Sequence, residues 1–526
     1  MKNFLSTKLF FALTLLCVIF LMYGKAVNFD LLSLDDTTSI SNNLERISKV
    51  KNIPSLFTTN CYNEEHATIP YYRPILVLTF SIETILFGYN TKVYHLGNLY
   101  LFIIALFVMY LFLLKLNFNK TISKFFLLLL AVHPVISSAA AYVSTRAEIL
   151  LAIFVLLSFI NLIDYLESGK KIYLVLYILL YTASLFTKES ALAFFPLYFI
   201  FIFLFKYKFT VKEYIKLFVL LLVPTILYFV CRNAAVPKTN LFYFLTNPTT
   251  YINFINVMAL YIRKILFPDY IHTILYNIQV SVTNITITIF FIIALAIAFY
   301  KKLADRRIII VSLFAIIALL FPTVFMYENQ VLYHRLFLPL FFLTMIFIQV
   351  TDTILKKKKN LKNLFLIMFI VLMTFFSLQS FRNVDKYINS DIFWLNMYKD
   401  ASNYHMCCSG LAKQFFYAQE YEEALKLFKE AKALNDLYIY SLNICTALIA
   451  LDRFDEAEKL LLELYKTKED FVVIFYLSQV YYYKDEMQKA VDFAKYAYTL
   501  KPKDEMLLKH IERLPGFDLN IHKHKD

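Results

Sequence analysis

The apolar stretch KLFFALTLLCVIFLMY (residues 8–23) decides the class of this fold. No small-residue cleavage site follows it, so we interpret it as an uncleaved first membrane span and not as a signal peptide. Runs rich in Leu, Ile and Phe recur up to residue 380, and many have the roughly 20 residues that a helix needs to cross a bilayer. With 526 residues, 60% hydrophobic content and a mean hydropathy of +0.59, the chain has the composition of an all-α polytopic membrane protein with a polar appendage.

The basic residues behind the net charge of +14 are distributed as the expected membrane topology requires. Short basic clusters separate the apolar runs, and a cytoplasmic N-terminus with about eleven spans places all of them on the cytoplasmic side. The basic balance therefore does not indicate nucleic-acid binding. An odd number of spans puts the C-terminal part outside, in the periplasm or lumen. The expected spans cover residues 8–28, 93–114, 123–141, 147–166, 172–187, 190–205, 215–232, 284–300, 308–325, 333–352 and 363–381.

Two further apolar segments are not counted as spans. Residues 74–89 carry Glu83 in the middle of the run, and counting them would move most basic clusters outside. We expect this segment, and residues 251–266, to lie as helices in the outer interface. The membrane domain then covers residues 1–384, with an outer loop at 29–92.

The C-terminal part is charged and helix-forming. Three similar stretches, EYEEALKLF, RFDEAEKLL and EMQKAVDFA, place Ala424, Ala457 and Ala490 at a period of 33 residues. This period predicts a solenoid of three tetratricopeptide repeats over residues 403–510, after a linker at 385–402 and before a polar tail at 511–526. Such a solenoid offers a concave surface for a peptide, or serves as a packing platform for its own membrane domain.

Ionisable residues on the expected outer side need their own explanation, because a charge at the membrane boundary is costly unless it is paired or solvated. Cations around a carboxylate suit a site that holds a lipid-linked phosphate while a base activates an acceptor. The adjacent carboxylates follow the first span directly. The residues concerned are Asp35, Asp36, Arg73, His133, Arg146, Glu148, Lys188, Glu189, Arg232, Arg263, Lys264, Glu328, His334 and Arg335.

Each of these residues also has a structural explanation. The aspartates can cap the helix that begins at Thr37, and His133 can end a helix before Pro134. Arg146 and Glu148 can pair with nearby charges. Walker, GxGxxG, GxSxG, HExxH and CxxC patterns do not occur, so nucleotide hydrolysis, serine-hydrolase chemistry and a structural metal have no support in the sequence.

In their residues and in their order along the chain, five motifs resemble those of the transmembrane and tetratricopeptide-repeat-containing O-mannosyltransferases. That family consists of GT-C glycosyltransferases related distantly to the protein O-mannosyltransferases. The chain departs from that family at Leu34, where an aromatic residue is frequent, and at Ile136-Ser137-Ser138, where His-Thr-Glu is usual. The motifs are LDDTTSISNN (34–43), YYRPILVLTFSIETILFGYN with VYHLGN (71–90, 93–98), AVHPVISSAAAYVSTRAEILLAIFVLLSF (131–159), LFTKESALAFFPL (185–197) and ENQVLYHRLFLPL (328–340).

The resemblance implies transfer of a monosaccharide, mannose by precedent, from a polyprenyl-phosphate donor to a hydroxyl acceptor such as a protein Ser or Thr. It implies neither a nucleotide nor a metal cofactor. By the same resemblance, Asp35 is the general base with Asp36 in support. The donor phosphate would be held by Arg73, Arg146, Lys188 and Arg335, and the supporting residues would be His133, Glu148, Glu189 and His334.

Two other functions stay open. A lipid-linked glycan ligase or polymerase would carry its catalytic Arg and His in a large late outer loop, whereas here the paired aspartates come first. A non-catalytic scaffold or transporter would recruit partners through its repeats, and a transporter should show Gly- or Pro-broken helices in matched halves. The Lys, Asn, Phe and Ile bias favours a bacterial inner membrane over an endoplasmic reticulum.

Overall fold

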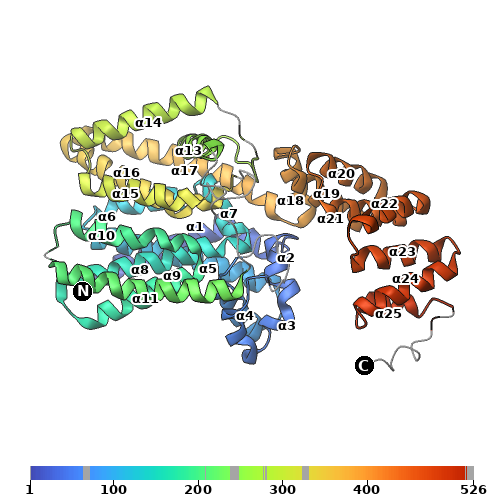
Figure 1. Cartoon of the computed structure of the whole chain (residues 1–526). Helices are drawn as coiled ribbons and strands as arrows, with labels where there is room; N and C mark the ends of the chain where they lie inside the picture. The colour runs from blue at the N-terminus through green and yellow to red at the C-terminus, as the bar shows by residue number, and fades with distance from the viewer. Residues whose placement is uncertain are drawn as a thin grey trace. The chain divides into compact units, whose positions relative to one another are not determined.

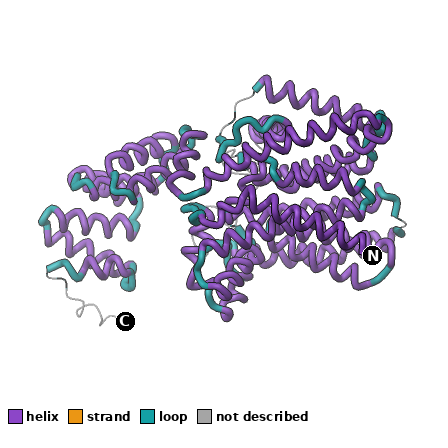
Figure 2. The backbone as a smooth tube through the Cα atoms, turned by 180° about the vertical axis from the view of Figure 1, so that it is seen from behind, coloured by secondary structure: helices purple, strands orange, loops and turns teal. Residues whose placement is uncertain are grey.

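The computed structural model describes residues 2–62, 71–207, 209–236, 248–276, 278, 281–322, 331–515 and 517 (Figure 1). Helices and their connections make up these residues, as Figure 2 shows, and the one pairing of extended backbone among them joins Leu275 to Val331. The predicted all-α class is therefore confirmed. The chain divides into two compact units, Met1–Phe393 and Trp394–Asp526.

The first unit is a bundle of long apolar helices with short helices at one end. Its helices are α1 (Lys2–Tyr23), α2 (Asp35–Ser39), α3 (Leu44–Ile47), α4 (Pro74–Phe87), α5 (Thr91–Lys115), α6 (Lys120–Ala131), α7 (Ser137–Ala141), α8 (Arg146–Ser168), α9 (Lys171–Thr187), α10 (Phe194–Leu204), α11 (Val211–Ala235), α13 (Pro248–Leu266), α14 (Val282–Tyr300), α15 (Arg306–Leu320), α16 (Phe337–Lys357) and α17 (Lys362–Val384).

Within the described residues, each of the eleven expected spans overlaps one of these helices or a pair of them. Among the described residues, seven helices are long and apolar enough to cross a membrane, and the bent pair Lys120–Ala131 and Pro134–Ala141 brings the number to eight. The expected spans at 172–187 and 190–205 lie in shorter apolar helices. The count of eleven thus stays a prediction.

The outer loop folds against α4. Pro74 opens α4, where its missing N–H costs nothing, and the 14 residues of the helix rise only about 21 Å, less than the thickness of the hydrocarbon core. Leu76 and Phe80 of α4 pack into a core with Ile47 and Leu56 of the preceding loop. The predicted helix is confirmed, and its interfacial position stays a prediction.

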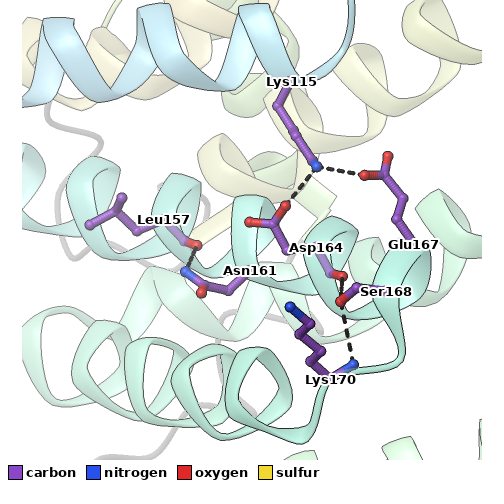
Figure 3. A network of polar contacts seen from close by, with 7 residues as sticks. All are labelled: Lys115, Leu157, Asn161, Asp164, Glu167, Ser168 and Lys170. Carbon is purple, nitrogen blue, oxygen red and sulfur yellow. Dashed lines mark hydrogen bonds and ion pairs between the residues drawn. The ribbon is translucent and has the colours of Figure 1, made fainter. Parts of the chain in front are cut away.

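Helices α5 and α8 run in the same direction and are joined by polar contacts at both ends. At one end, which we call the site end, Arg146 Nη2 donates to the carbonyl oxygen of Tyr94 over 2.7 Å. At the other, the basal end, Lys115 Nζ lies 2.6 Å from a carboxylate oxygen of both Asp164 and Glu167 (Figure 3). The 23 residues of α8 separate the two ends by about 34 Å.

The second unit contains three helix pairs and a final helix. Helix α18 (Ser390–Asp400) leads into it, and Trp394 packs so closely on Gly410 that an added Cβ there would lie 2.1 Å from the indole. First helices begin at His405, Tyr438 and Phe471 and second helices at Tyr421, Phe454 and Met487, so both series keep the 33-residue spacing; the tetratricopeptide class stays a prediction. The helices are α19 (His405–Tyr417), α20 (Tyr421–Leu434), α21 (Tyr438–Ala450), α22 (Phe454–Thr467), α23 (Phe471–Tyr483), α24 (Met487–Leu500) and α25 (Glu505–Ile511).

Candidate functional site

The paired aspartates open α2 at the site end, and their side chains have different environments. Asp36 is fully buried. Its Oδ2 accepts from the backbone N–H of Leu32 at 3.1 Å, and its Oδ1 accepts from the N–H and the hydroxyl of Ser144 at 2.8 and 2.5 Å. Asp36 therefore fixes the outer loop to the turn before α8. Burial raises the pKa of its carboxyl to about 7, although these donors favour the ionised form.

Asp35 is only partly buried. Its Oδ1 accepts a 3.0 Å hydrogen bond from the Tyr62 hydroxyl, and its backbone N–H donates to the hydroxyl of Tyr142 at 3.3 Å. Burial raises the pKa of the Asp35 carboxyl, while the Tyr62 hydrogen bond and the positive charge of Arg73 act in the opposite direction. A carboxylate in this environment combines raised basicity with an ionised form that its neighbours stabilise, as a general base requires.

Arg73 and Glu189 form a two-pronged ion pair beside Asp35. Arg73 Nη2 and Nε donate to the two carboxylate oxygens of Glu189 over 2.7 and 3.1 Å, and the guanidinium lies over the Tyr71 ring. Burial acts to raise the pKa of Glu189, but the charge and hydrogen bonds of Arg73, together with the Lys188 charge, outweigh burial and hold that pKa at about 2. Glu189 is therefore ionised and keeps Arg73 oriented.

Lys188 and Glu148 form a second ion pair, and both side chains are largely buried. Burial lowers the pKa of the Lys188 ammonium, whereas the Glu148 carboxylate raises it. Lys188 follows α9, and Glu148 lies in the first turn of α8, so the pair joins two helices that hold the site. Removal of one partner would leave the other charge buried and unpaired.

His334 and Arg335 reach the same region from η8 (Tyr333–Leu336). His334 lies within electrostatic reach of Lys188 and Arg73, and the Arg335 charge acts on Tyr71. Segments that are distant in the sequence thus bring eight of the ten predicted residues together. They are Asp35, Asp36, Arg73, Glu148, Lys188, Glu189, His334 and Arg335. Glu328 lies outside the described residues.

Arg146 makes its contacts elsewhere at the site end. It is 0% exposed and donates to Thr79, Glu83 and the Tyr94 carbonyl at 3.2, 2.8 and 2.7 Å. Gly97 makes room for this pair, because a Cβ there would lie 1.9 Å from Glu83 Oε1. Arg146 therefore ties α4 to α5 and α8.

His133 caps the short helix Pro134–Ile136. Its Nδ1 accepts from the N–H of Val135 at 3.3 Å, its Nε2 lies 3.1 Å from the Ile265 carbonyl oxygen, and its ring packs on Phe376. These contacts connect the bend between α6 and α7 to α13 and α17.

Sequence reasoning did not single out Tyr62, Tyr142 or Ser144. Tyr62 lies in the outer loop without a distinguishing pattern, whereas Tyr142 and Ser144 fall inside the quoted stretch 131–159. Tyr142 stacks on Tyr387 of the segment after α17, which fixes its hydroxyl beside Asp35. The position of Tyr142 between two short helices is the one feature that could have marked it as a site residue.

An apolar groove of about 440 Å³ adjoins the site end. Its walls come from α13, α14, α15 and α16, and its lining on α15 runs from Ile309 to Leu320, about 17 Å along the helix. Leu336 lines the groove directly after Arg335, and Tyr261, another lining residue, donates its hydroxyl to the Leu332 carbonyl over 3.1 Å. The groove therefore reaches the segment that carries the Arg335 cation.

Within the described part of the chain, no group of three or more His, Cys, Asp and Glu side chains is arranged to hold a metal ion. The expectation of a metal-independent site stays a prediction.

Comparison with known proteins gives partial matches. No family model and no solved structure matches the chain. Human "Protein O-mannosyl-transferase TMTC1" is 27% identical over 189 residues, which is 33% of this chain and 21% of that protein. Human "Protein O-mannosyl-transferase TMTC3" is 32% identical over 130 residues, 24% of this chain and 14% of that protein.

The matched region thus spans about a fifth or less of each of these relatives. Their names agree with the family that the sequence motifs resemble. Over part of its length, this multi-helix chain is similar to proteins named protein O-mannosyl-transferases, which supports a membrane glycosyltransferase.

Proposed function

We propose that this chain is an integral-membrane glycosyltransferase that moves a monosaccharide, mannose by precedent, from a polyprenyl-phosphate donor to a hydroxyl group. The observation that carries the proposal is the partly exposed Asp35 carboxylate beside Arg73, whose charge also reaches His334, as do the charges of Lys188 and Arg335. The acceptor is a protein Ser or Thr on the outer face of a bacterial inner membrane, and the helix pairs of the second unit present the peptide.

In the proposed reaction, Asp35 takes the proton of the acceptor hydroxyl. The acceptor oxygen bonds to the anomeric carbon from the face opposite the phosphate, and the bond from that carbon to the phosphate oxygen breaks. Its electron pair leaves with the polyprenyl phosphate, so the anomeric centre inverts. Cations at the leaving oxygen stabilise the negative charge that develops there.

The cations have two different parts in this scheme. Arg335, next to the apolar groove, and Lys188 hold the donor phosphate, while Arg73 is oriented by Glu189 and tunes Asp35. Arg146 is a positioning residue, because its contacts with Thr79, Glu83 and Tyr94 hold α4 in place.

The apolar groove supports a lipid-linked donor. A chain in the groove would place its attached phosphate next to Leu336 and hence beside Arg335. Burial of the chain along α15 contributes binding free energy away from the reacting bond, which orients the donor.

The test is transfer of labelled mannose from polyprenyl-phosphate mannose to a Ser/Thr-rich peptide by the purified chain in proteoliposomes. We expect Asp35→Asn to lower the rate by about 100-fold or more, because it removes the general base. Asp164→Asn at the basal end is the matched control and should retain the rate. Absence of transfer by the wild type, or full transfer by Asp35→Asn, would refute the proposal.

A further inference from the structure

A second, polar cavity lies at the basal end of the first unit, away from the candidate site. Its volume is about 490 Å³, and it lies between the connection before α6, the turn from α14 to α15, and the last turns of α16. Asp352 on its wall follows Arg335 by 17 positions on nearly continuous helix, which corresponds to about 26 Å. The cavity is therefore separate from the Asp35 cluster.

The carboxylates of this basal cavity are already neutralised. Asp305 accepts two hydrogen bonds from Arg307, with Nε at 3.0 Å and Nη2 at 2.5 Å. Asp352 lies 2.6 Å from Lys356 Nζ and accepts from the Asn119 amide at 2.8 Å.

The cations that line the cavity have no carboxylate partner among the described residues. Arg306 donates through Nε to the Phe299 carbonyl over 3.2 Å, which leaves its terminal nitrogens available, and Lys302 is exposed. Gln349 accepts from the Asp305 N–H at 2.7 Å, so its amide NH₂ can donate to a ligand. The cavity thus presents two positive charges and neutral donors around a space of ligand size.

We propose that this basal cavity binds the phosphate group of an anionic membrane lipid, with Arg306 and Lys302 as its charged ligands. Arg binds phosphate through paired N–H groups and Lys binds it as a point charge. The lipid is the source because the cavity lies at one end of a bundle of apolar helices, where the headgroups of a surrounding bilayer would lie, and because more cations, from Lys356 to Lys359, lie at the end of α16 and directly after it.

Unspecific attraction between basic residues and a charged bilayer would give a different pattern. In that case any two cations at this end would contribute equally, because surface charges act through the summed field. Lys170, which lies at the basal end (Figure 3), and Lys171, which begins α9 directly after it, provide the comparison, since both are exposed and neither lines the cavity.

The experiment is native mass spectrometry of the full chain released from detergent with equal amounts of phosphatidylglycerol and phosphatidylcholine. We expect the wild type and the Lys170→Gln/Lys171→Gln variant to retain phosphatidylglycerol preferentially. Lys302→Gln/Arg306→Gln should lose about tenfold or more in affinity, because it removes two charge-assisted contacts. A far-UV circular dichroism spectrum identical to the wild type shows that this variant is folded, and Lys302→Arg should retain the lipid.

Three results overturn the proposal. Equal loss in both double variants would mean that general charge attraction holds the lipid, and no preference for phosphatidylglycerol in the wild type would mean that the headgroup is not recognised. If inorganic phosphate raises the unfolding temperature of the wild type but not of Lys302→Gln/Arg306→Gln, while lipid retention is equal in the two, the phosphate has a soluble source and the lipid assignment is wrong.

Discussion

Replacement of Gly97 by alanine should destabilise the first unit, although the same change favours an isolated helix. Gly97 lies inside α5, where alanine is preferred over glycine by about 1 kcal/mol. Tertiary contacts make the effect of Gly97→Ala on protein stability the opposite of its effect on an isolated helix. A Cβ at Gly97 would lie 1.9 Å from Glu83 Oε1 and 3.2 Å from Arg146 Nη2, so the Glu83 carboxylate has to withdraw.

The expected loss of stability follows from the state of Arg146 once Glu83 has withdrawn from it. Arg146 is fully buried, and loss of one partner from a buried ion pair costs about 3–5 kcal/mol. Because Glu83 is partly exposed, the lower end of this range applies. After subtraction of the helix preference of about 1 kcal/mol, the free energy of unfolding should fall by about 2 kcal/mol.

The measurement is unfolding of the detergent-solubilised chain, followed by far-UV circular dichroism. Gly24→Ala is the control: the nearest atom to its added Cβ is Phe20 Cδ1 at 3.7 Å, so stability should change by less than about 0.5 kcal/mol. In a Glu83→Ala background, where the obstructing oxygen is absent, Gly97→Ala should cause no further loss.

Two outcomes would refute this reasoning. One is a Gly97→Ala protein as stable as the wild type or more stable, which would mean that the ion pair rearranges without cost. The other is an equal loss from Gly97→Ala in the wild-type and Glu83→Ala backgrounds, which would assign the effect to another contact. Because α4 begins directly after Arg73, the destabilised variant should also transfer mannose more slowly.

Three further predictions concern other contacts. Tyr62→Phe removes the 3.0 Å hydrogen bond that lowers the pKa of Asp35, so the acidic limb of the pH profile of kcat/KM should move to higher pH; an unchanged limb would contradict the role of Asp35 as base. Burial raises the pKa of Asp36 to about 7, so between about pH 4 and 7 the folded protein keeps a proton that the unfolded chain releases, and the free energy of unfolding should fall as pH rises through this window. Asp36→Asn should make the free energy of unfolding less dependent on pH in this window, and the same pH dependence in the variant would exclude Asp36 as its source. Gly410→Ala places a Cβ 2.1 Å from Trp394, the single tryptophan, and should destabilise the second unit by about 1–3 kcal/mol, which Trp fluorescence during unfolding reports; an unchanged midpoint would show that the indole can move.

The candidate site could be predicted in part from the sequence. Spacing and resemblance pointed to Asp35 and Arg73, and the structure places both in one cluster. The partners of Arg146 were not predictable, because Glu83 lies on another helix and the space for its carboxylate is left by Gly97 on a third. Likewise, nothing in the local sequence marks Tyr62 as the donor to Asp35, since 27 residues separate them.

By itself, the sequence determined the helices of the membrane domain and the 33-residue spacing of the helix pairs. Both depend on local patterns of apolar residues, which fix helix type and length before any long-range contact forms. The resemblance named Asp35 as the base, and the tertiary structure alone decided the different environments of the two adjacent carboxylates. Neighbouring side chains point in different directions, so Asp36 meets Ser144, 108 residues away, and is saturated by hydrogen bonds, while Asp35 stays partly exposed among the cations.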